Sequence, residues 1–262
     1  LSPISHRRIN YMNSLNKVVI FGATSGIAEQ AARQLVREGA SVFCVARNAE
    51  KLDALLTDLR VRGQSGQHIA GCIADLDDVA QHETLWQEAK SSLQGCDGVL
   101  LAQGVLPNQA ECQQSGSQTL SAIHTNALAP IHLLTLIAND FEAQKQGAIA
   151  VISSVAGDRG RQSNYVYGAA KGLLTTFLQG LRNRLFKSGV SVITVKPGFT
   201  RTQMTAGMNR EGFLWADADE VARGIVNAMR KGKDEVYLKP VWRVVMTVIK
   251  LIPETIFKRL SL

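Results

Sequence analysis

The sequence lacks the features that mark metal sites, membrane spans and secretion. Its four cysteines (Cys44, Cys72, Cys96 and Cys112) are scattered, with no Cys-x-x-Cys pair and no histidine cluster, so we expect buried thiols and no metal site. No apolar run reaches the roughly 18 residues that a membrane span needs. The basic N-terminus lacks the apolar core of a signal peptide. Together these absences predict a protein of a reducing compartment, which we take to be the cytoplasm.

The remaining composition is that of one globular domain. The chain has 262 residues, of which 45% are hydrophobic and 19% charged, enough to bury a large core. Residues 1–16 show no strong pattern and are interpreted as an N-terminal extension. The net charge of +7 is not organised into a recognised nucleic-acid module, so no nucleic-acid partner is expected.

Strand-like and helix-like segments alternate along the chain. Helical patterns follow the first glycine-rich turn up to Glu38 and continue at 49–62, 77–93, 118–143, 163–187 and 217–230. Strand patterns occur at 17–21, 41–46, 67–73, 97–101, 147–152, 190–196 and 234–238. This alternation predicts an α/β fold, a Rossmann-type doubly wound parallel sheet of about seven strands with helices on both faces, in a single domain over 17–238.

The first strand opens directly into a glycine turn that precedes a helix. A pyrophosphate at a helix N-terminus needs bare backbone close to it, which glycine permits. The spacing is Gly-x-x-x-Gly-x-Ala, and a generic glycine turn is the alternative. The turn predicts dinucleotide contacts from Gly22, Thr24, Ser25, Gly26 and Ile27.

The end of the second strand bears on the choice of nicotinamide cofactor. An acidic residue there would bind the ribose 2′-hydroxyl of NAD, but Ala46 stands at this position and Arg47 follows it. A cation can pair with a 2′-phosphate. The pattern favours NADP(H) over NAD(H), the alternative being that Arg47 is a solvated loop residue.

A tyrosine and a lysine stand one helical turn apart in the segment 163–187. Tyr167 and Lys171 would lie on one helix face, and a nearby ammonium favours the phenolate. We therefore expect the pKa of Tyr167 to fall below its usual value of about 10, which would suit proton transfer near neutral pH. Tyr165 lacks such a cation, because its i+4 residue is Ala169.

Over residues 17–238 the sequence resembles the short-chain dehydrogenase/reductase family. Ser154 stands thirteen residues before Tyr167, which is the family spacing, whereas Ser153 is one residue out of register. One departure is Ala102-Gln103-Gly104, which stands where the family usually has Asn-Ala-Gly. The other matching positions are the turn residues Gly22, Gly26 and Ala28, the pair Asp75-Leu76, Asn126, and Pro197-Gly198-Phe199 with Thr202.

The resemblance implies a mechanism and a set of contacts. Ser154 would hydrogen-bond a substrate carbonyl, Tyr167 would protonate it, Lys171 would lower the pKa of that tyrosine and bind the nicotinamide ribose, and Asn126 would hold a water of the proton relay. Asp75 and Leu76 would meet the adenine. The family's cofactor-binding positions further include Ala102, Gly104, Pro197, Gly198, Phe199 and Thr202. A homodimer or homotetramer is usual in this family.

Residues 199–216 correspond to the segment that forms a lid in this family. Apolar side chains and two arginines in it would suit a lipid-linked or anionic substrate, and the alternative is that they only pack the lid against the body. The residues concerned are Met204, Met208, Phe213, Leu214, Trp215, Arg201 and Arg210.

The tail, residues 239–262, is apolar and basic. It holds five basic residues and one acidic residue, a net +4 out of the total of +7. An apolar segment that carries Trp242 and Phe257, is flanked by Lys and Arg and is too short to span is typical of an interfacial membrane anchor. We therefore expect either peripheral membrane contact through 241–260, which would place the protein at the inner face of the membrane, or packing against the body or a second subunit.

The tail and the stretch Val155-Ala156-Gly157-Asp158-Arg159 are similar to one branch of the family, the decaprenylphosphoryl-pentofuranosid-2-ulose 2-reductases. These enzymes reduce a keto-sugar carried on a polyprenyl phosphate. The resemblance implies a reductase of such a substrate or a soluble reductase of small ketones or aldehydes. A nucleotide-binding regulator without catalysis is a third hypothesis, but it predicts loss of Ser154, Tyr167 or Lys171, and all three are present.

Overall fold

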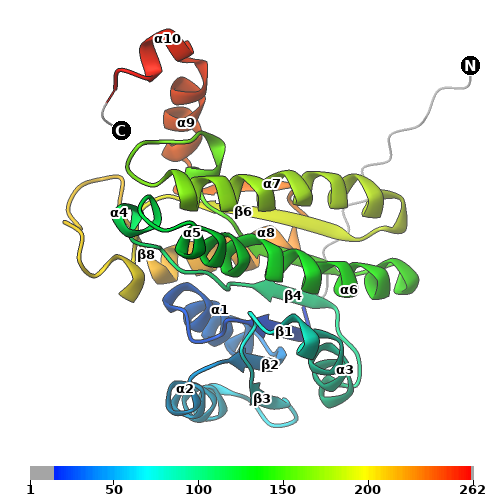
Figure 1. Cartoon of the computed structure of the whole chain (residues 1–262). Helices are drawn as coiled ribbons and strands as arrows, with labels where there is room; N and C mark the ends of the chain where they lie inside the picture. Colours follow the sequence, from blue (N-terminus) through cyan, green and yellow to red (C-terminus); the bar gives the residue numbers. More distant parts are fainter. Residues whose placement is uncertain (1–14, 261–262) are drawn as a thin grey trace, which may run out of the picture.

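The computed structural model describes residues 15–260 and is built on a seven-stranded sheet whose strand order is β3-β2-β1-β4-β5-β6-β9 (Figure 1). All neighbouring strands in it run parallel. Its strands are β1 (Lys17–Phe21), β2 (Ser41–Ala46), β3 (Ile69–Ile73), β4 (Gly98–Leu101), β5 (Ala148–Ile152), β6 (Ser191–Pro197) and β9 (Glu235–Leu238). The predicted single-domain Rossmann-type sheet is confirmed, and each strand lies within two residues of its expected range.

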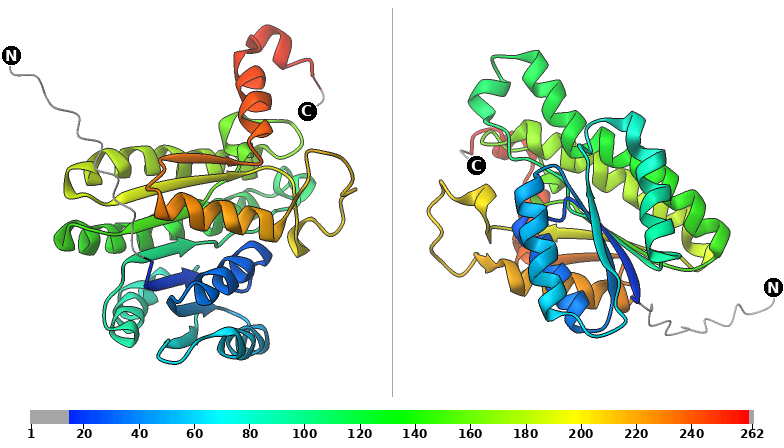
Figure 2. Two further views of the ribbon diagram at one scale, coloured as in Figure 1. Left: turned by 180° about the vertical axis from the view of Figure 1, so that it is seen from behind. Right: turned by 90° about the horizontal axis from the view of Figure 1, so that it is seen from below.

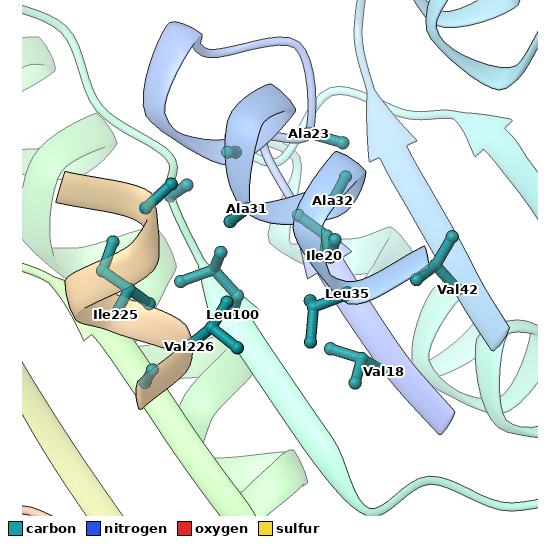
Figure 3. Close-up of a cluster of buried hydrophobic side chains, with 14 of the residues drawn as sticks. Val18, Ile20, Ala23, Ala31, Ala32, Leu35, Val42, Leu100, Ile225 and Val226 are labelled. Atoms are coloured by element: carbon teal, nitrogen blue, oxygen red, sulfur yellow. The ribbon is translucent and has the colours of Figure 1, made fainter. Parts of the chain in front are cut away.

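Helices cover both faces of the sheet because the strand residues alternate between two apolar clusters. Val18 and Ile20 of β1 belong to the cluster under α1 (Gly26–Arg37), α2 (Ala49–Arg62) and α8 (Ala218–Arg230) (Figure 3). Val19 and Phe21 belong to the opposite cluster, under α3 (His82–Leu93), α6 (Ala129–Gln144) and α7 (Tyr165–Leu185). All four side chains are fully buried, and each contributes about 1.5–3 kcal/mol to folding.

The helix expected over 118–143 is interrupted at its middle. The structure has α5 (Gly116–Ile123), then a π-helical turn η2 (His124–Leu128), then α6. Asn126 lies in this turn and its amide Nδ2 donates to the carbonyl oxygen of Ala122 at 2.9 Å. By length and apolar composition, 116–144 would be able to cross a membrane, but half of its most apolar window is buried in this fold. Its segment α6 is a core helix of the domain.

The fold begins before β1. Leu15 is buried in the first apolar cluster, and the Asn16 carbonyl accepts a hydrogen bond from the Ser41 amide at 2.7 Å. The last two residues of the expected extension therefore belong to the domain, because they extend the β1 edge to β2. Residues 1–14 of that extension lie outside the described residues.

The tail forms α9 (Val241–Leu251) and α10 (Glu254–Phe257) at the β9 end of the sheet (Figures 1 and 2). Trp242 and Met246 are buried in a small cluster with Val155 and Tyr237. Arg159 of the β5–α7 loop fixes the end of α9, because its Nη1 donates to the carbonyls of Ile249 and Ile252, each at 2.6 Å. One face of the tail thus packs against the body.

Candidate active site

A cavity of about 690 Å³ opens at the carboxyl ends of the parallel strands. This is the edge at which parallel α/β sheets bind ligands, because the strand–helix loops meet there. The cavity is lined by all of the predicted cofactor contacts: Gly22, Thr24, Ser25, Gly26, Ile27, Arg47, Asp75, Leu76, Ala102, Gly104, Tyr167, Lys171, Pro197, Gly198, Phe199 and Thr202. The fold therefore brings together residues that are spread over 180 positions of the chain.

The glycine turn after β1 has the close approaches that a dinucleotide cradle needs. Gly22 has a φ of +73°, and a Cβ there would lie 2.9 Å from the backbone nitrogen of Gln103. A Cβ on Gly26 would meet Thr202 at 3.3 Å. Ser25 caps α1, because its hydroxyl accepts from the Ala28 amide. The bare backbone at a capped helix N-terminus fits a pyrophosphate.

Cationic and polar side chains surround the end of β2. Arg47 and Lys51 both line the cavity, and Asn48 between them caps α2 by accepting from the Lys51 amide at 2.8 Å. Ala46 places no carboxylate at the end of this strand. Two cations that follow a strand end without a carboxylate fit a ribose 2′-phosphate.

Gln103, in the segment Ala102-Gln103-Gly104 that departs from the family pattern, bonds to Asp77. The Gln103 amide donates to Asp77 at 2.8 Å, and the Thr125 hydroxyl donates to the other carboxylate oxygen of Asp77 at 2.6 Å. Gly104 is closely packed, since a Cβ there would lie 2.9 Å from Asn126 Oδ1 and 3.3 Å from Lys171 Nζ. The altered sequence thus keeps the close approach that Gly104 provides.

Ser154, Tyr167 and Lys171 meet in the wall of the cavity, and Asn126 lies buried behind it. Ser154 and Tyr167 are joined by a side-chain hydrogen bond. Lys171 Nζ lies 5.8 Å from the centre of the Tyr167 ring and donates to the Ile152 carbonyl at 3.1 Å. Asn126 Oδ1 accepts from the Val105 amide at 3.1 Å, which fixes its orientation. The four predicted catalytic residues therefore converge on one end of the cavity.

The two neighbouring serines have different environments. Ser153 is buried, and its hydroxyl bonds to the Lys171 carbonyl at 3.1 Å and to the Thr175 hydroxyl at 2.8 Å. Ser154 is only half-buried, and its hydroxyl accepts from the Ala156 amide at 3.1 Å, a bond that does not use the Ser154 proton. The geometry therefore favours Ser154 as the hydroxyl that would meet a ligand.

The expected direction of the tyrosine pKa is wrong. Burial raises the pKa of Tyr167 to about 12, and the hydrogen bond with Ser154 offsets this only in part. Burial also lowers the pKa of Lys171 to about 8. Desolvation penalises the charged form of both groups and outweighs the attraction between phenolate and ammonium that the helical spacing suggested. Tyr167 is therefore held as a neutral phenol, the form that donates a proton.

The lid segment and the tail line one part of the cavity and contact each other. Within the lid, β7 (Thr200–Arg201) pairs with β8 (Ala216–Asp217). The Phe199 ring stacks on Trp215 at 5.1 Å and meets Trp242 of α9 edge-on at 5.2 Å. A Cβ on Gly198 would lie 1.9 Å from Trp242 Nε1, so only glycine admits this ring.

The lid side chains differ in what they offer to a ligand. Met204 and Met208 line the cavity, whereas Phe213 is 75% exposed to solvent. Arg201 pairs with Asp217 at 3.0 Å, and Arg210 donates to the carbonyls of Thr202 and Thr205. The two arginines that the sequence offered for binding an anionic substrate thus make their bonds within the lid segment.

Several residues that line the cavity were not predicted from the sequence as site residues. For Lys51, the first turn of a helix after β2 was an available signal. Asp77, Arg161 and Asn164 lie in irregular segments, and Trp242 comes from a tail whose packing the sequence left open. The cavity residues outside the prediction include Asn48, Lys51, Asp77, Arg161, Asn164 and Trp242.

Residues 16–212 match the family model for short chain dehydrogenases. An uncharacterized oxidoreductase of Mycobacterium tuberculosis is 33% identical over 243 residues, which cover 93% of this chain and 96% of that protein. A 3-oxoacyl-[acyl-carrier-protein] reductase of Bos taurus is 29% identical over 73% of this chain and 78% of its own length. The crystal structure of levodione reductase superposes with a TM-score of 0.77 at 19% identity, over 86% of this chain and 97% of that one.

Proposed function

The chain belongs to the short-chain dehydrogenase/reductase family, oxidoreductases that act on CH–OH or carbonyl groups with a nicotinamide cofactor, and from that premise we propose that it is an NADPH-dependent carbonyl reductase. The observation that carries the proposal is the meeting of a neutral phenol, a serine hydroxyl and a buried lysine at one end of a cavity whose other end is a glycine cradle. Reduction needs a proton donor, and a tyrosine with a raised pKa supplies one.

The side chains divide the work at the carbonyl. When bound, the nicotinamide supplies a hydride to the carbonyl carbon. Ser154 donates a hydrogen bond to the carbonyl oxygen and stabilises its developing charge. Tyr167 gives its phenolic proton to that oxygen, which yields the alcohol. Lys171, whose pKa lies near 8, can return a proton to Tyr167. Asn126 holds the backbone behind the site in place through its bonds to Val105 and Ala122.

Cofactor preference can be tested by fluorescence titration with NADPH and NADH. We expect NADPH to bind about tenfold more tightly or better, because Arg47 and Lys51 line the cavity where they would hold a 2′-phosphate, and Ala46 places no carboxylate at the strand end. Arg47→Ala should remove most of this preference, and R37A, an exposed arginine at the far end of α1, should not. Equal affinities in the wild type would contradict the assignment of NADPH.

The substrate is proposed to be amphiphilic, such as a keto-sugar on a polyprenyl phosphate. Met204, Met208 and Trp242 contribute an apolar part to the wall of the cavity. A second apolar surface lies on the outer face of α9, where Val244 is 65%, Val248 59% and Leu251 76% exposed. The competing proposal, a soluble reductase of small ketones, does not account for this exposed apolar surface.

We further propose that the outer face of α9 makes peripheral contact with the cytoplasmic face of a membrane. A dimer or tetramer, the usual assembly of the family, is proposed from the family alone. Sedimentation with anionic vesicles tests the contact, and light scattering the assembly. Because Trp242 and Met246 are buried, deleting the tail would damage the fold, and V244S/V248S is the sharper change. We expect it to weaken vesicle binding, while V61S, on a residue of α2 that is 83% exposed, leaves it unchanged. Absence of wild-type binding would favour the soluble reductase.

A further inference from the structure

Three arginines of the β5–α7 loop and the lid hold neighbouring segments of the protein together. Arg159 bonds the tail carbonyls, pairs with Glu254 at 3.0 Å and stacks on Phe257. Arg201 pairs with Asp217, and Arg210 bonds lid carbonyls. All three guanidinium groups have partners within the protein.

Arg161 is different. It is half-buried and lines the cavity, yet within residues 15–260 no carboxylate pairs with its guanidinium, and its buried Nε has no hydrogen-bond partner. Burial lowers its pKa from the usual value. A desolvated cation without a partner is costly and calls for a compensating anion.

Asn164 lies three residues further along the same loop and also lines the cavity. Its Oδ1 is buried and has no hydrogen-bond partner among the described residues, so it could accept from a hydroxyl. Arg161 and Asn164 both stand between Ser154 and Tyr167 in the chain. The Gly168 amide donates to the Asn164 carbonyl at 2.8 Å and the Asn164 amide donates to the Arg161 carbonyl at 3.1 Å, so both residues lie within two turns of Tyr167. We therefore assign them to the carbonyl end of the cavity, whereas Gly22, Gly26 and Arg47 form the cradle for the cofactor phosphates.

We propose that Arg161 binds an anionic group, a carboxylate or a phosphate, carried by the carbonyl substrate, and that Asn164 accepts a hydrogen bond from a substrate hydroxyl. This assignment rests on the proposed reduction at Tyr167. It makes the substrate class an anionic hydroxyketone or keto-sugar. A neutral ketone would leave the guanidinium uncompensated.

The test compares ketones that differ only in charge. One arm uses straight-chain keto acids, with one to five carbons between carbonyl and carboxylate, against their methyl esters. The other uses dihydroxyacetone phosphate against dihydroxyacetone. For at least one pair we expect the wild type to prefer the anion by about 10- to 100-fold in kcat/KM, as for a charge-assisted hydrogen bond in a partly dry site. The arm in which the preference appears distinguishes carboxylate from phosphate.

Variants show whether a preference for the anionic ketone depends on Arg161. Arg161→Gln should abolish it, R161K should retain part of it, and R223Q, an exposed arginine on α8, should leave it intact. Quenching of bound NADPH fluorescence gives dissociation constants for the same pairs without turnover. The inference is overturned if no anion binds better than its neutral partner, or if R161Q keeps the preference. Turnover of the neutral ketones and NADPH affinity report separately on the proposed reduction.

Discussion

Two charged residues of the loop between β5 and α7, Asp158 and Arg161, differ in whether they have partners of opposite charge. At Asp158 the loop enters a buried cluster, in which Lys196 Nζ lies 2.6 Å from Asp158 and 2.7 Å from Glu235. The Tyr237 hydroxyl donates to the other Asp158 oxygen at 2.7 Å. Three residues later, Arg161 lines the cavity with no carboxylate partner within the described part of the chain.

Burial alone does not separate these two environments, since both remove charge from water. What separates them is whether the polar atoms have found partners within the protein. The Asp158 cluster is satisfied and pins the loop to the sheet. On the cavity side, the Lys171 ammonium and the Arg161 guanidinium have no carboxylate partner among the described residues, as a site that receives an anionic ligand requires. The comparison predicts a loss of stability when the satisfied cluster is broken, and a loss of function together with a pH-dependent stability on the cavity side.

The largest expected effect is on the cavity side. Tyr167→Phe removes the proton donor, and we expect kcat for the best ketone to fall about 10²- to 10⁴-fold while NADPH affinity changes little. Stopped-flow oxidation of NADPH measures this. Y165F is the matched control, because the same hydroxyl is removed two residues away from a side chain that is 43% exposed. If Y167F keeps a tenth of the wild-type rate, another group donates the proton.

The next effect is on the satisfied side. Lys196→Met leaves Asp158 and Glu235 without their cation, and we expect a loss of about 3–5 kcal/mol in the free energy of unfolding. Urea denaturation of the cofactor-free protein measures it. The control is R223Q, which breaks the exposed pair with Asp219 and should cost about 1 kcal/mol or less. Equal costs for the two variants would mean that the buried cluster does not anchor the loop.

The sequence predicted those parts of the molecule that depend on local pattern. The strand ranges, the glycine turn and the choice of Ser154 over Ser153 follow from periodicity, from spacing and from family resemblance. The direction of the Tyr167 pKa did not, because burial depends on the lid and on segments distant in the chain. For the same reason the sequence could not tell that Arg201 and Arg210 have partners and that the Arg161 side chain has none among residues 15–260. The π-helical turn at Asn126 likewise has no signature in the helical pattern around it.

The smallest expected effect is a change in how stability depends on pH. Because burial lowers the pKa of Lys171 from 10.5 to about 8, the unfolded chain holds this proton and the folded chain does not between about pH 8 and 10. The free energy of unfolding of the wild type should therefore rise through this window, relative to Lys171→Met, by up to about 1.4 kcal/mol per pH unit. Urea denaturation at pH 7, 8, 9 and 10 measures the difference, with K187M as the control for loss of an exposed lysine. Parallel profiles for wild type and K171M would show that folding does not destabilise the charged form of Lys171. The proposed difference between the satisfied Asp158 cluster and the uncompensated cations of the cavity would then be wrong for Lys171.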